Sequence, residues 1–303
     1  MTATTTPAVG VGAPADATRT AGAASVAVAA LRRTGVVLLT TVVAFVVLMA
    51  LWILLLRLFD VSSFVGKSPL DVWQYLFADQ PARGIRPASM TAEQARAESF
   101  GALWTTLGNA AVGFVSGMVV ATAIAVAFVL FRPFEFAFMP IAMLLRSVPL
   151  VAMAPVLLLA VGQGKLGIAV IAAVVVLFPA LVNIVVGLRS ASPQALDLIR
   201  VNGGTELLAL RKVRLPAALP HLFAAVRISV PGAIVGGMLA EWLVGFEGLG
   251  GVLSGYKGAG NYGGVWTVVV LAVMASIVLY GVATVVEAVV LAAWGPEAGR
   301  SGR

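Results

Sequence analysis

The sequence predicts an all-α integral membrane protein with about six transmembrane helices and with both termini in the cytoplasm. Of its 303 residues, 60% are hydrophobic and only 11% are charged, against roughly 45–50% and about 25% in ordinary globular domains. A soluble chain of this composition could not cover its surface with polar groups. The apolar residues also fall into runs as long as a bilayer requires. We therefore expect a multi-pass protein of the plasma or inner membrane.

Six apolar segments are each long enough for the roughly 20 residues that cross a bilayer. Pro149 and Pro155 should kink the third of them. Arg32 and Arg33 precede the first segment, as they would in a secretory signal. However, its apolar run is longer than the about 7–15 residues of a signal core, and no Ala-x-Ala site follows, so we expect an uncleaved helix over 32–58. The six segments cover residues 34–56, 103–131, 136–161, 166–188, 222–244 and 263–294.

The distribution of lysine and arginine predicts the orientation. With the N-terminus inside, eleven of these residues lie on the cytoplasmic side and seven on the outer side, which is the asymmetry that cytoplasmic loops usually show. The net charge of +7 then reflects membrane topology, and we expect no nucleic-acid partner. Residues 1–31, rich in Ala, Thr, Gly and Pro, predict a disordered cytoplasmic tail, and residues 296–303 form a second one.

The composition also excludes several kinds of chemistry. There is no cysteine and a single histidine, His221, which excludes disulfides, thiol catalysis and a multi-histidine metal centre. The run from Gly162 to Leu166 lacks the earlier glycine and the following Ser or Thr of a phosphate-binding loop. We therefore expect no cofactor, metal or ATP site on this chain.

The outer loop, residues 59–102, contains two helix-start signals. Ser68, Pro69 and Asp71 predict a cap, a first helical residue and a first-turn acid. A second start is expected near Thr91, with Glu93 in its first turn. The loop either carries short amphipathic helices on the outer membrane surface or simply connects two spans. The apolar residues at helical spacing after Pro69 are Leu70, Trp73, Leu76 and Phe77.

The cytoplasmic segment 190–220 carries the strongest turn signals of the chain. Ser192 and Pro193 predict a helix that the glycines at 203–204 end. Thr205 predicts the cap of a second short helix, which Pro216 should terminate. Such a loop is longer and more structured than a connection needs, so the two helices should meet at a glycine elbow that docks on another protein. The apolar residues expected on display are Leu196, Ile199, Leu207, Leu208 and Leu210.

This segment resembles the EAA loop of permease subunits in binding-protein-dependent ABC importers. That pattern is Glu-Ala-Ala, three residues, Gly, nine residues and Ile-x-Leu-Pro. The spacing matches here without gaps, although aspartate replaces glutamate and Leu-Ile replaces Ala-Ala. The residues that the resemblance assigns to ATPase coupling are Asp197, Leu198, Ile199, Gly203, Gly204, Val213, Leu215 and Pro216.

Flanking stretches extend the resemblance over about residues 65–295. They include the Leu-Leu-Arg-x-x-Pro motif that ends at Pro149, two stretches that contain Arg227 and Glu241, and a Gly-Leu-Gly motif that begins at Gly248. Together these motifs point to the sulfonate/nitrate/taurine branch. The five-helix permease core is then residues 103–295, with the coupling loop inside it.

The resemblance implies a transport subunit without enzymatic activity of its own. It implies a path for a small solute, either a sulfonate-, nitrate- or taurine-like anion or a vitamin-precursor-like molecule. The expected partners are separate cytoplasmic ATPase subunits that hold ATP and Mg, a second permease copy or paralogue, an extracytoplasmic binding protein and membrane lipid. ATP-driven closure of the ATPases would draw the elbows together and turn the path outward.

Ionisable residues within the spans admit two interpretations, because an isolated charge is costly there. Arg146 or Arg227 could meet an anionic solute, and Glu241 could form part of a gate. Alternatively, these residues pair with one another, with Glu287 or with the carbonyls of a kinked helix, which is the interpretation we favour for the arginines. For Glu241, the alternative is that it helps to pack the Gly-rich loop that follows it. Two rival functions use such residues differently: a secondary transporter with a proton relay, and an intramembrane enzyme. The first usually shows internal repeats, and the second lacks a clustered acid pair, cysteine or histidine pair.

Overall fold

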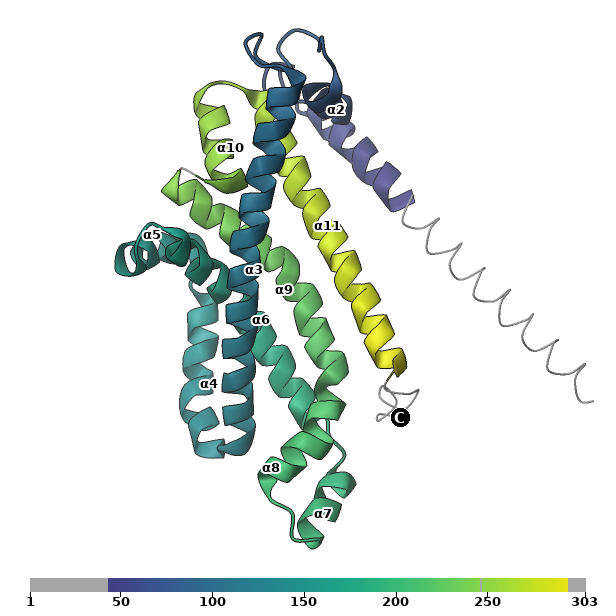
Figure 1. The fold of residues 1–303 in the computed structure, drawn as a ribbon, viewed down its shortest axis with the longest axis vertical. Coiled ribbons are helices and arrows are strands. Elements are labelled where there is room, and N and C mark those ends of the chain that lie inside the picture. The colour runs from purple at the N-terminus through teal and green to yellow at the C-terminus, as the bar shows by residue number, and fades with distance from the viewer. Residues whose placement is uncertain (1–42, 246, 294–303) are drawn as a thin grey trace, which may run out of the picture. The chain divides into compact units, whose positions relative to one another are not determined.

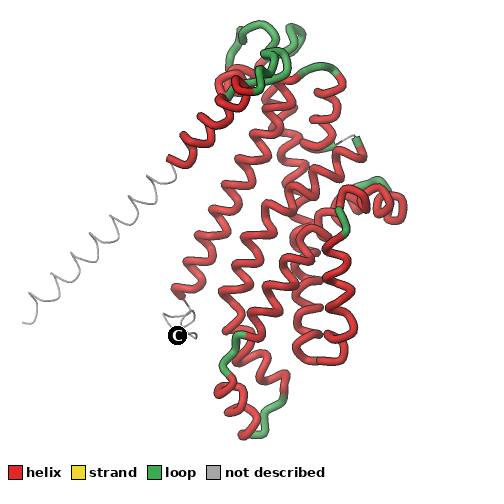
Figure 2. Tube along the Cα trace, turned by 180° about the vertical axis from the view of Figure 1, so that it is seen from behind, coloured by secondary structure: helices red, strands yellow, loops and turns green. Residues whose placement is uncertain are grey.

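The protein is described here from a computed structural model, which covers residues 43–245 and 247–293 (Figure 1). Every regular element within these ranges is a helix (Figure 2). The chain divides into two units, Met1–Ser62 and Ser63–Arg303. In the first unit, the structure describes an apolar helix, Val43–Leu58, which covers the C-terminal part of the first expected span. The expected tails 1–31 and 296–303 lie outside the described residues.

Four helices of the second unit are long and apolar enough to cross a membrane: Ala92–Leu130, Lys165–Arg189, Glu206–Val244 and Tyr262–Ala292. They correspond to the second, fourth, fifth and sixth expected spans, and they confirm an all-α membrane protein. Three of them are labelled α3 (Ala92–Leu130), α6 (Lys165–Arg189) and α11 (Tyr262–Ala293). The helix of the fifth expected span, Glu206–Val244, consists of several consecutive segments, the last of which is α9 (Leu215–Val244).

The third expected span, 136–161, is two helices rather than one kinked helix. These are α4 (Arg132–Ser147) and α5 (Leu150–Val161), and Figure 1 shows α5 lying across the end of α4. The chain leaves the helix at Val148 because the residue before a proline is biased away from helical geometry. Pro149 then acts as the N-cap of α5. At 16 and 12 residues, neither piece alone reaches the length of a full span.

Small residues let α3 and α9 approach α6 from two sides. A Cβ atom on Gly113 would lie 2.4 Å from the Cβ of Ala172, and one on Gly117 would lie 2.7 Å from the carbonyl oxygen of Ala173. From α9, a Cβ on Gly236 would lie 2.7 Å from Val175 Cγ2. Close backbone approach of this kind stabilises helix pairs where lipid provides no hydrophobic driving force. Three helices therefore form one tightly packed body.

Residues 63–91 fold into a compact cap, and both helix starts expected in this part of the chain are confirmed. α2 (Pro69–Phe77) begins with a capping box between Ser68 and Asp71. Thr91 forms a second capping box at the start of α3, and that helix continues without interruption into the second span. On α2, Leu76 is buried, whereas the side chains that remain exposed along one face are Leu70, Trp73 and Phe77.

A buried arginine closes this cap. Arg86 donates hydrogen bonds to the carbonyl oxygens of Tyr75, Ala78, Asp79 and Met90 at 2.7–3.1 Å. The first three of these carbonyls lie at the C-terminal end of α2, where helix carbonyls lack partners of their own. The guanidinium therefore holds the end of α2 to the segment that leads into α3.

A short helix that the sequence did not predict, α10 (Gly248–Gly258), lies before α11. Its glycines indicated a loop, because glycine is a poor helix former. Here the same glycines allow the helix to pack closely against α3, α9 and α11. Tertiary packing therefore outweighs the low helix propensity.

Candidate functional site

The elbow consists of α7 (Pro193–Val201), a turn, and α8 (Glu206–Ala209). Both lie beyond the lower ends of the long helices in Figure 1. Gly203 has a φ of +75°, a left-handed conformation that costs other residues about 1–2 kcal/mol. The N–H of Gly204 donates to the carbonyl of Ile199 at 2.8 Å, and that of Gly203 donates to Arg200 at 3.0 Å. This pair of bonds is the Schellman motif of a helix end.

Each glycine of the elbow is required for a different structural reason. Gly203 supplies the left-handed turn and has open space around it, whereas Gly204 supplies room. A Cβ on Gly204 would lie 2.4 Å from Ile199 Cγ2. The predicted helix stop is therefore confirmed at both positions.

The second half of the elbow starts as predicted at Thr205. Its hydroxyl accepts a hydrogen bond from the N–H of Leu208 at 3.3 Å. Arg200 then links the two helices, because its guanidinium lies 3.3 Å from Asp197 Oδ1 and 3.0 Å from Glu206 Oε1. These pairs are exposed to solvent, which screens them, so each contributes little to stability. Asp197 remains on the surface.

The apolar residues of the elbow divide into a buried and an exposed set. Leu196 and Ala209 pack in a small core with Ala191, which holds α7 against α8. Leu210 is buried too, so the prediction that Leu196 and Leu210 are displayed is wrong. Ile199 is half-buried. The exposed set, which we call the elbow patch, is Leu198, Val201, Leu207 and Leu208.

Pro216 does not end the second helix, contrary to the sequence prediction. Leu210–Arg214 forms a π-helical turn, in which the N–H of Leu215 donates to the carbonyl of Leu210. Proline disrupts the ordinary pattern because it lacks an N–H and its ring meets the carbonyl four residues back. The wider turn accommodates it, and Pro216 lies in the first turn of α9. α8 is consequently continuous with the fifth span as one helix, Glu206–Val244.

The remaining coupling-loop residues lie where this helix leaves the elbow. Val213 packs at the edge of the small core beneath α7. Leu215 is partly exposed, at 41%. The elbow is therefore joined to a membrane-spanning helix without an intervening loop.

A second group of functional candidates surrounds Glu241, whose side chain is fully buried on α9. Its carboxylate accepts hydrogen bonds from Thr106 Oγ1 at 2.6 Å, from Asn109 Nδ2 at 2.9 Å and from the N–H of Gly250 at 3.2 Å. Thr106 in turn accepts a hydrogen bond from the N–H of Leu249 at 2.7 Å. We call these five residues the Glu241 cluster. It joins α3, α9 and α10.

Of the two roles expected of Glu241, packing of the Gly-rich segment agrees with its hydrogen bond from Gly250, whereas its partners Thr106 and Asn109 were not predicted. Thr106 and Asn109 are ordinary residues within an apolar run, and nothing in their spacing marks them. The Gly-Leu-Gly motif was the available signal, because a Cβ on Gly248 would lie 2.3 Å from Glu241 Cδ. Because the carboxylate of Glu241 comes this close to Gly248, this segment packs against Glu241 and is not a free loop.

The two arginines expected within the spans have different outcomes. Arg227 on α9 pairs with Glu287 on α11, with 3.0 Å between Nη1 and Oε2, as the pairing interpretation expects. Arg146 lies on α4, but its side chain is outside what the structure describes. The residue after it, Ser147, lines a cavity of about 360 Å³ at the break between α4 and α5, whose far wall is α6.

Irregular backbone at membrane depth is tolerated where protein buries it or where it lines a cavity. The break at Val148–Pro149 meets the second condition, because it lines the cavity.

Within the described ranges, no group of three or more His, Cys, Asp or Glu side chains could hold a metal ion.

Comparison with known proteins provides evidence on the family of the chain that does not depend on the structure. A family model described as "Binding-protein-dependent transport system inner membrane component" matches residues 113–291, which include the elbow, Glu241 and both arginines. With the four spans, this match confirms the prediction of a multi-pass membrane protein.

Among curated relatives, the chain is 32% identical over 127 residues to the riboflavin transport system permease protein RibX of Chloroflexus aurantiacus, covering 42% of this chain and 47% of that one. It is 31% identical over 116 residues to the formylaminopyrimidine transport permease protein ThiX of Halalkalibacterium halodurans, covering 38% and 46%. It is 29% identical over 153 residues to the putative aliphatic sulfonates transport permease protein SsuC of Bacillus subtilis, covering 50% and 55%. The chain thus spans about half the length of the relatives it matches.

Proposed function

The chain belongs to the family of binding-protein-dependent transport system inner membrane components, and from this premise we propose that it is the permease subunit of an ATP-driven importer. It forms the path for a small solute and couples to a separate ATPase through the elbow. The observation that carries the proposal is the elbow patch. Four apolar side chains lie exposed beside Asp197 and Arg200 at the tip of a short, internally braced helix pair.

The elbow patch supports docking because a surface of this kind is unfavourable in water unless a partner covers it. The continuity of Glu206–Val244 supports the transmission of movement from that partner into the membrane. ATP and Mg then belong to the ATPase, and this chain carries neither.

The topology that we propose places the elbow and both termini in the cytoplasm and residues 59–102 outside. A second permease, identical or paralogous, would complete the path, and an extracytoplasmic binding protein would deliver solute to the outer side. Residues 103–295 form the five-helix core, residues 32–58 add a helix, and residues 1–31 and 296–303 are tails. The excess of positive residues on the elbow side supports this orientation.

For the path itself, we propose the cavity at the break between α4 and α5, with Arg146 as the residue to test for solute contact. The ion pair of Arg227 with Glu287 and the three donors to Glu241 support structural roles for these residues rather than contact with solute.

The solute is either a vitamin-precursor-like molecule or a sulfonate- or nitrate-like anion. The named relatives include both kinds. Uptake of riboflavin, a formylaminopyrimidine, taurine and nitrate by cells that express the complete system would separate the two classes.

Copurification tests the coupling proposal. The chain is co-expressed with the ATPase encoded beside its gene, in native form and as Leu198→Asp. The matched control is Leu70→Asp on α2, because Leu198 and Leu70 are similarly exposed, at 65% and 63%. We expect the ATPase to copurify with the native chain and with Leu70→Asp, and to be reduced at least about tenfold with Leu198→Asp, since burial of one leucine contributes about 1.5–3 kcal/mol.

The opposite result would favour the secondary transporter. In that case no ATPase binds any variant, and the chain alone in liposomes moves solute along an ion gradient. Asp197→Lys and Gly203→Trp serve as independent elbow variants, and the mass of the complex distinguishes one permease copy from two.

A further inference from the structure

A large cavity lies along one face of α4, and its Arg214 end adjoins the base of the elbow. Its volume is about 790 Å³. The α4 residues that line it are spaced three and four apart, so they form a single helical face: Arg132, Glu135, Phe136, Met139, Pro140 and Met143. The end of α3, the last residue of α6 and the π turn complete its walls.

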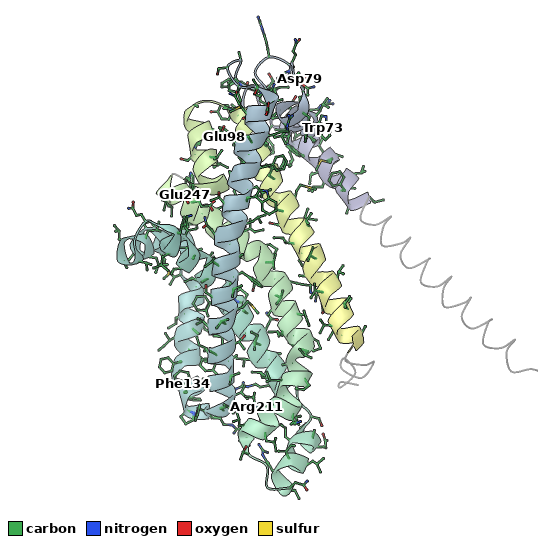
Figure 3. All side chains as sticks on the ribbon, in the orientation of Figure 1. Trp73, Asp79, Glu98, Phe134, Arg211 and Glu247 are labelled. Carbon is green, nitrogen blue, oxygen red and sulfur yellow. The ribbon has the colours of Figure 1, made fainter. Side chains whose placement is uncertain are left out.

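Charged groups gather at one end of this cavity. Arg132 begins α4, Arg189 ends α6, and Arg214 ends the π turn. Glu135 pairs with Arg189, so three cations face one anion. In Figure 3, Phe134, near Arg132, and Arg211, near Arg214, lie toward the same lower end of the molecule. The charged end of the cavity is thus the end that carries the elbow, where the spans meet water.

Two of the three arginines have donors without a protein acceptor among the described residues: Arg132 is exposed to solvent, and Arg214 is mostly buried. Arg132 has no hydrogen-bond or ion-pair partner among the described residues, and it stands at the N-terminus of α4, where the helix dipole favours an anion. Arg214 donates to the carbonyl of Leu188 at 3.3 Å and lies 3.9 Å from Glu206. Its Nε is buried and finds no acceptor within the described part of the chain. Both cations therefore suit an anionic ligand.

The rest of the cavity is apolar. From Phe136 the wall continues through Met139, Pro140 and Met143, and Phe128 and Val129 of α3 face it. From Arg132 to Met143 the face is about 16 Å long at 1.5 Å per residue. One leaflet of the hydrocarbon core is about 15 Å thick. The cavity thus has a cationic end at the membrane boundary and an apolar groove as deep as one leaflet.

We propose that this cavity binds an anionic phospholipid, with its phosphate between Arg132 and Arg214 and one acyl chain along α4. The occupant is a lipid because free phosphate or a small anionic solute would have no use for a leaflet-long apolar groove. Basic pockets between membrane helices bind such head groups. Binding depends only on the cavity, whereas the assignment to the cytoplasmic leaflet rests on the proposed function.

The site also has a consequence for the elbow. Arg214 is the last residue of the π turn and immediately precedes α9. Its neighbours Leu188 and Glu206 belong to α6 and α8. A phosphate shared by Arg132 and Arg214 would tie α4 to the base of the elbow. We therefore expect anionic lipid to make coupling more efficient as well as to bind.

The experiment measures lipid retained by the full chain, purified in detergent and analysed by native mass spectrometry after exposure to phosphatidylglycerol or phosphatidylcholine. We expect phosphatidylglycerol to be retained preferentially. Arg132→Gln should weaken its binding about tenfold, because a hydrogen bond to a charged group contributes about 1.5 kcal/mol or more. Arg83→Gln, an exposed arginine of the outer loop, is the matched control and should leave retention unchanged.

A second variant separates a lipid from a soluble anion. Phe136→Ser removes an apolar wall whose side chain is 88% exposed, so folding should be preserved, as a melting curve would verify. It should weaken phosphatidylglycerol retention but not the ability of inorganic phosphate to raise the melting temperature.

Three results would overturn the proposal. Equal retention of the two lipids would exclude a role for the charge. Phosphatidylglycerol retention that Phe136→Ser leaves unchanged would indicate that only the head group binds, as at a free-anion site. A crosslink from position 136 to another protein segment would indicate that protein fills the groove. Copurification of the ATPase with Arg132→Gln is read separately, so a failed importer assignment cannot be mistaken for a failed lipid site.

Discussion

The elbow and the opposite end of the same unit are held together by contacts of very different range. In the elbow, the hydrogen bonds of the turn and of Arg200 join residues three to six positions apart. At the opposite end, the Glu241 cluster joins residues 132 to 143 positions apart, and Asn261 donates to the Tyr75 hydroxyl across 186 positions at 2.9 Å. The elbow is also exposed, whereas these long-range contacts are buried.

The difference indicates what each end can tolerate. An exposed helix pair with a small core can shift or loosen without disturbing the rest of the fold, as elements that move and dock commonly do. A buried carboxylate with three donors cannot lose a partner without leaving polar groups unsatisfied. We therefore expect changes at the elbow to affect docking more than stability, and changes at the Glu241 cluster to do the reverse.

The largest effect is expected from Glu241→Ala. The substitution leaves the hydroxyl of Thr106, the amide of Asn109 and the N–H of Gly250 without their acceptor, and it creates a cavity. Each of the first two losses costs about 1–3 kcal/mol, so we expect the free energy of unfolding to fall by about 3 kcal/mol or more. Unfolding of the purified chain in detergent, followed by circular dichroism, measures this change.

The conservative variant and a control make that prediction specific. Glu241→Gln keeps one acceptor oxygen and the volume, so it should recover part of the loss. Glu93→Ala, in the exposed first turn of α3, should change the unfolding free energy by no more than about 0.5 kcal/mol. Equal stability of native chain and Glu241→Ala would show that the cluster does not hold these three helices together.

A smaller and more local effect is expected from Gly203→Val. The side chain must adopt the φ of +75°, at a cost of about 1–2 kcal/mol, and a β-branched residue is the least suited to it. Because the elbow is exposed and packs around a small core of its own, the cost should appear as faster amide hydrogen exchange from residue 193 to residue 209, with little change in global unfolding.

Gly203→Asn is the matched variant, because asparagine tolerates the left-handed region better than other non-glycine residues. It should preserve the protection of the elbow and most ATPase copurification. If Gly203→Val lowered global stability as much as Glu241→Ala, the proposed independence of the two ends would be wrong.

The contrast between short-range and long-range contacts also explains which features could be predicted from the sequence. Helix starts at Ser68, Thr91 and Thr205 and the stop at Gly203 were predictable, because caps and turns depend on residues within a few positions. The elbow could be located for the same reason. The partners of Glu241 could not be predicted, because Thr106 and Asn109 acquire their role only when α3 packs beside α9.

Errors in the sequence analysis arose where tertiary structure overrode a local rule. Pro216 signals a helix end, yet a π turn absorbs it. The glycines at 248–251 signal a loop, yet they form a packed helix. Pro149 was expected to kink one span and instead separates two helices, because the residue before a proline is biased away from helical geometry.

The smallest effect concerns the alkaline side of the pH range at the opposite end. Burial raises the pKa of the Tyr256 phenol well above its usual value, and neighbouring Tyr75 and the charge of Glu98 raise it further. Burial also raises the pKa of Tyr75, although its hydrogen bond from Asn261 acts in the opposite direction. Folding therefore favours the neutral phenols. That stability is fully present below the unfolded pKa of about 10 and is lost as the pH rises above it.

Tyr256→Phe isolates this contribution, because the hydroxyl of Tyr256 has no hydrogen-bond partner within the described residues. At pH 7 the variant should therefore be as stable as the native chain, within about 1 kcal/mol. Between about pH 10 and 11.5 the native chain should lose up to about 1.4 kcal/mol per pH unit for each affected phenol, and the variant should lose less. Chemical unfolding at a series of pH values measures both slopes. Parallel slopes would mean that the Tyr256 phenol is not held neutral by folding, and the outer end would then owe its pH response to other groups.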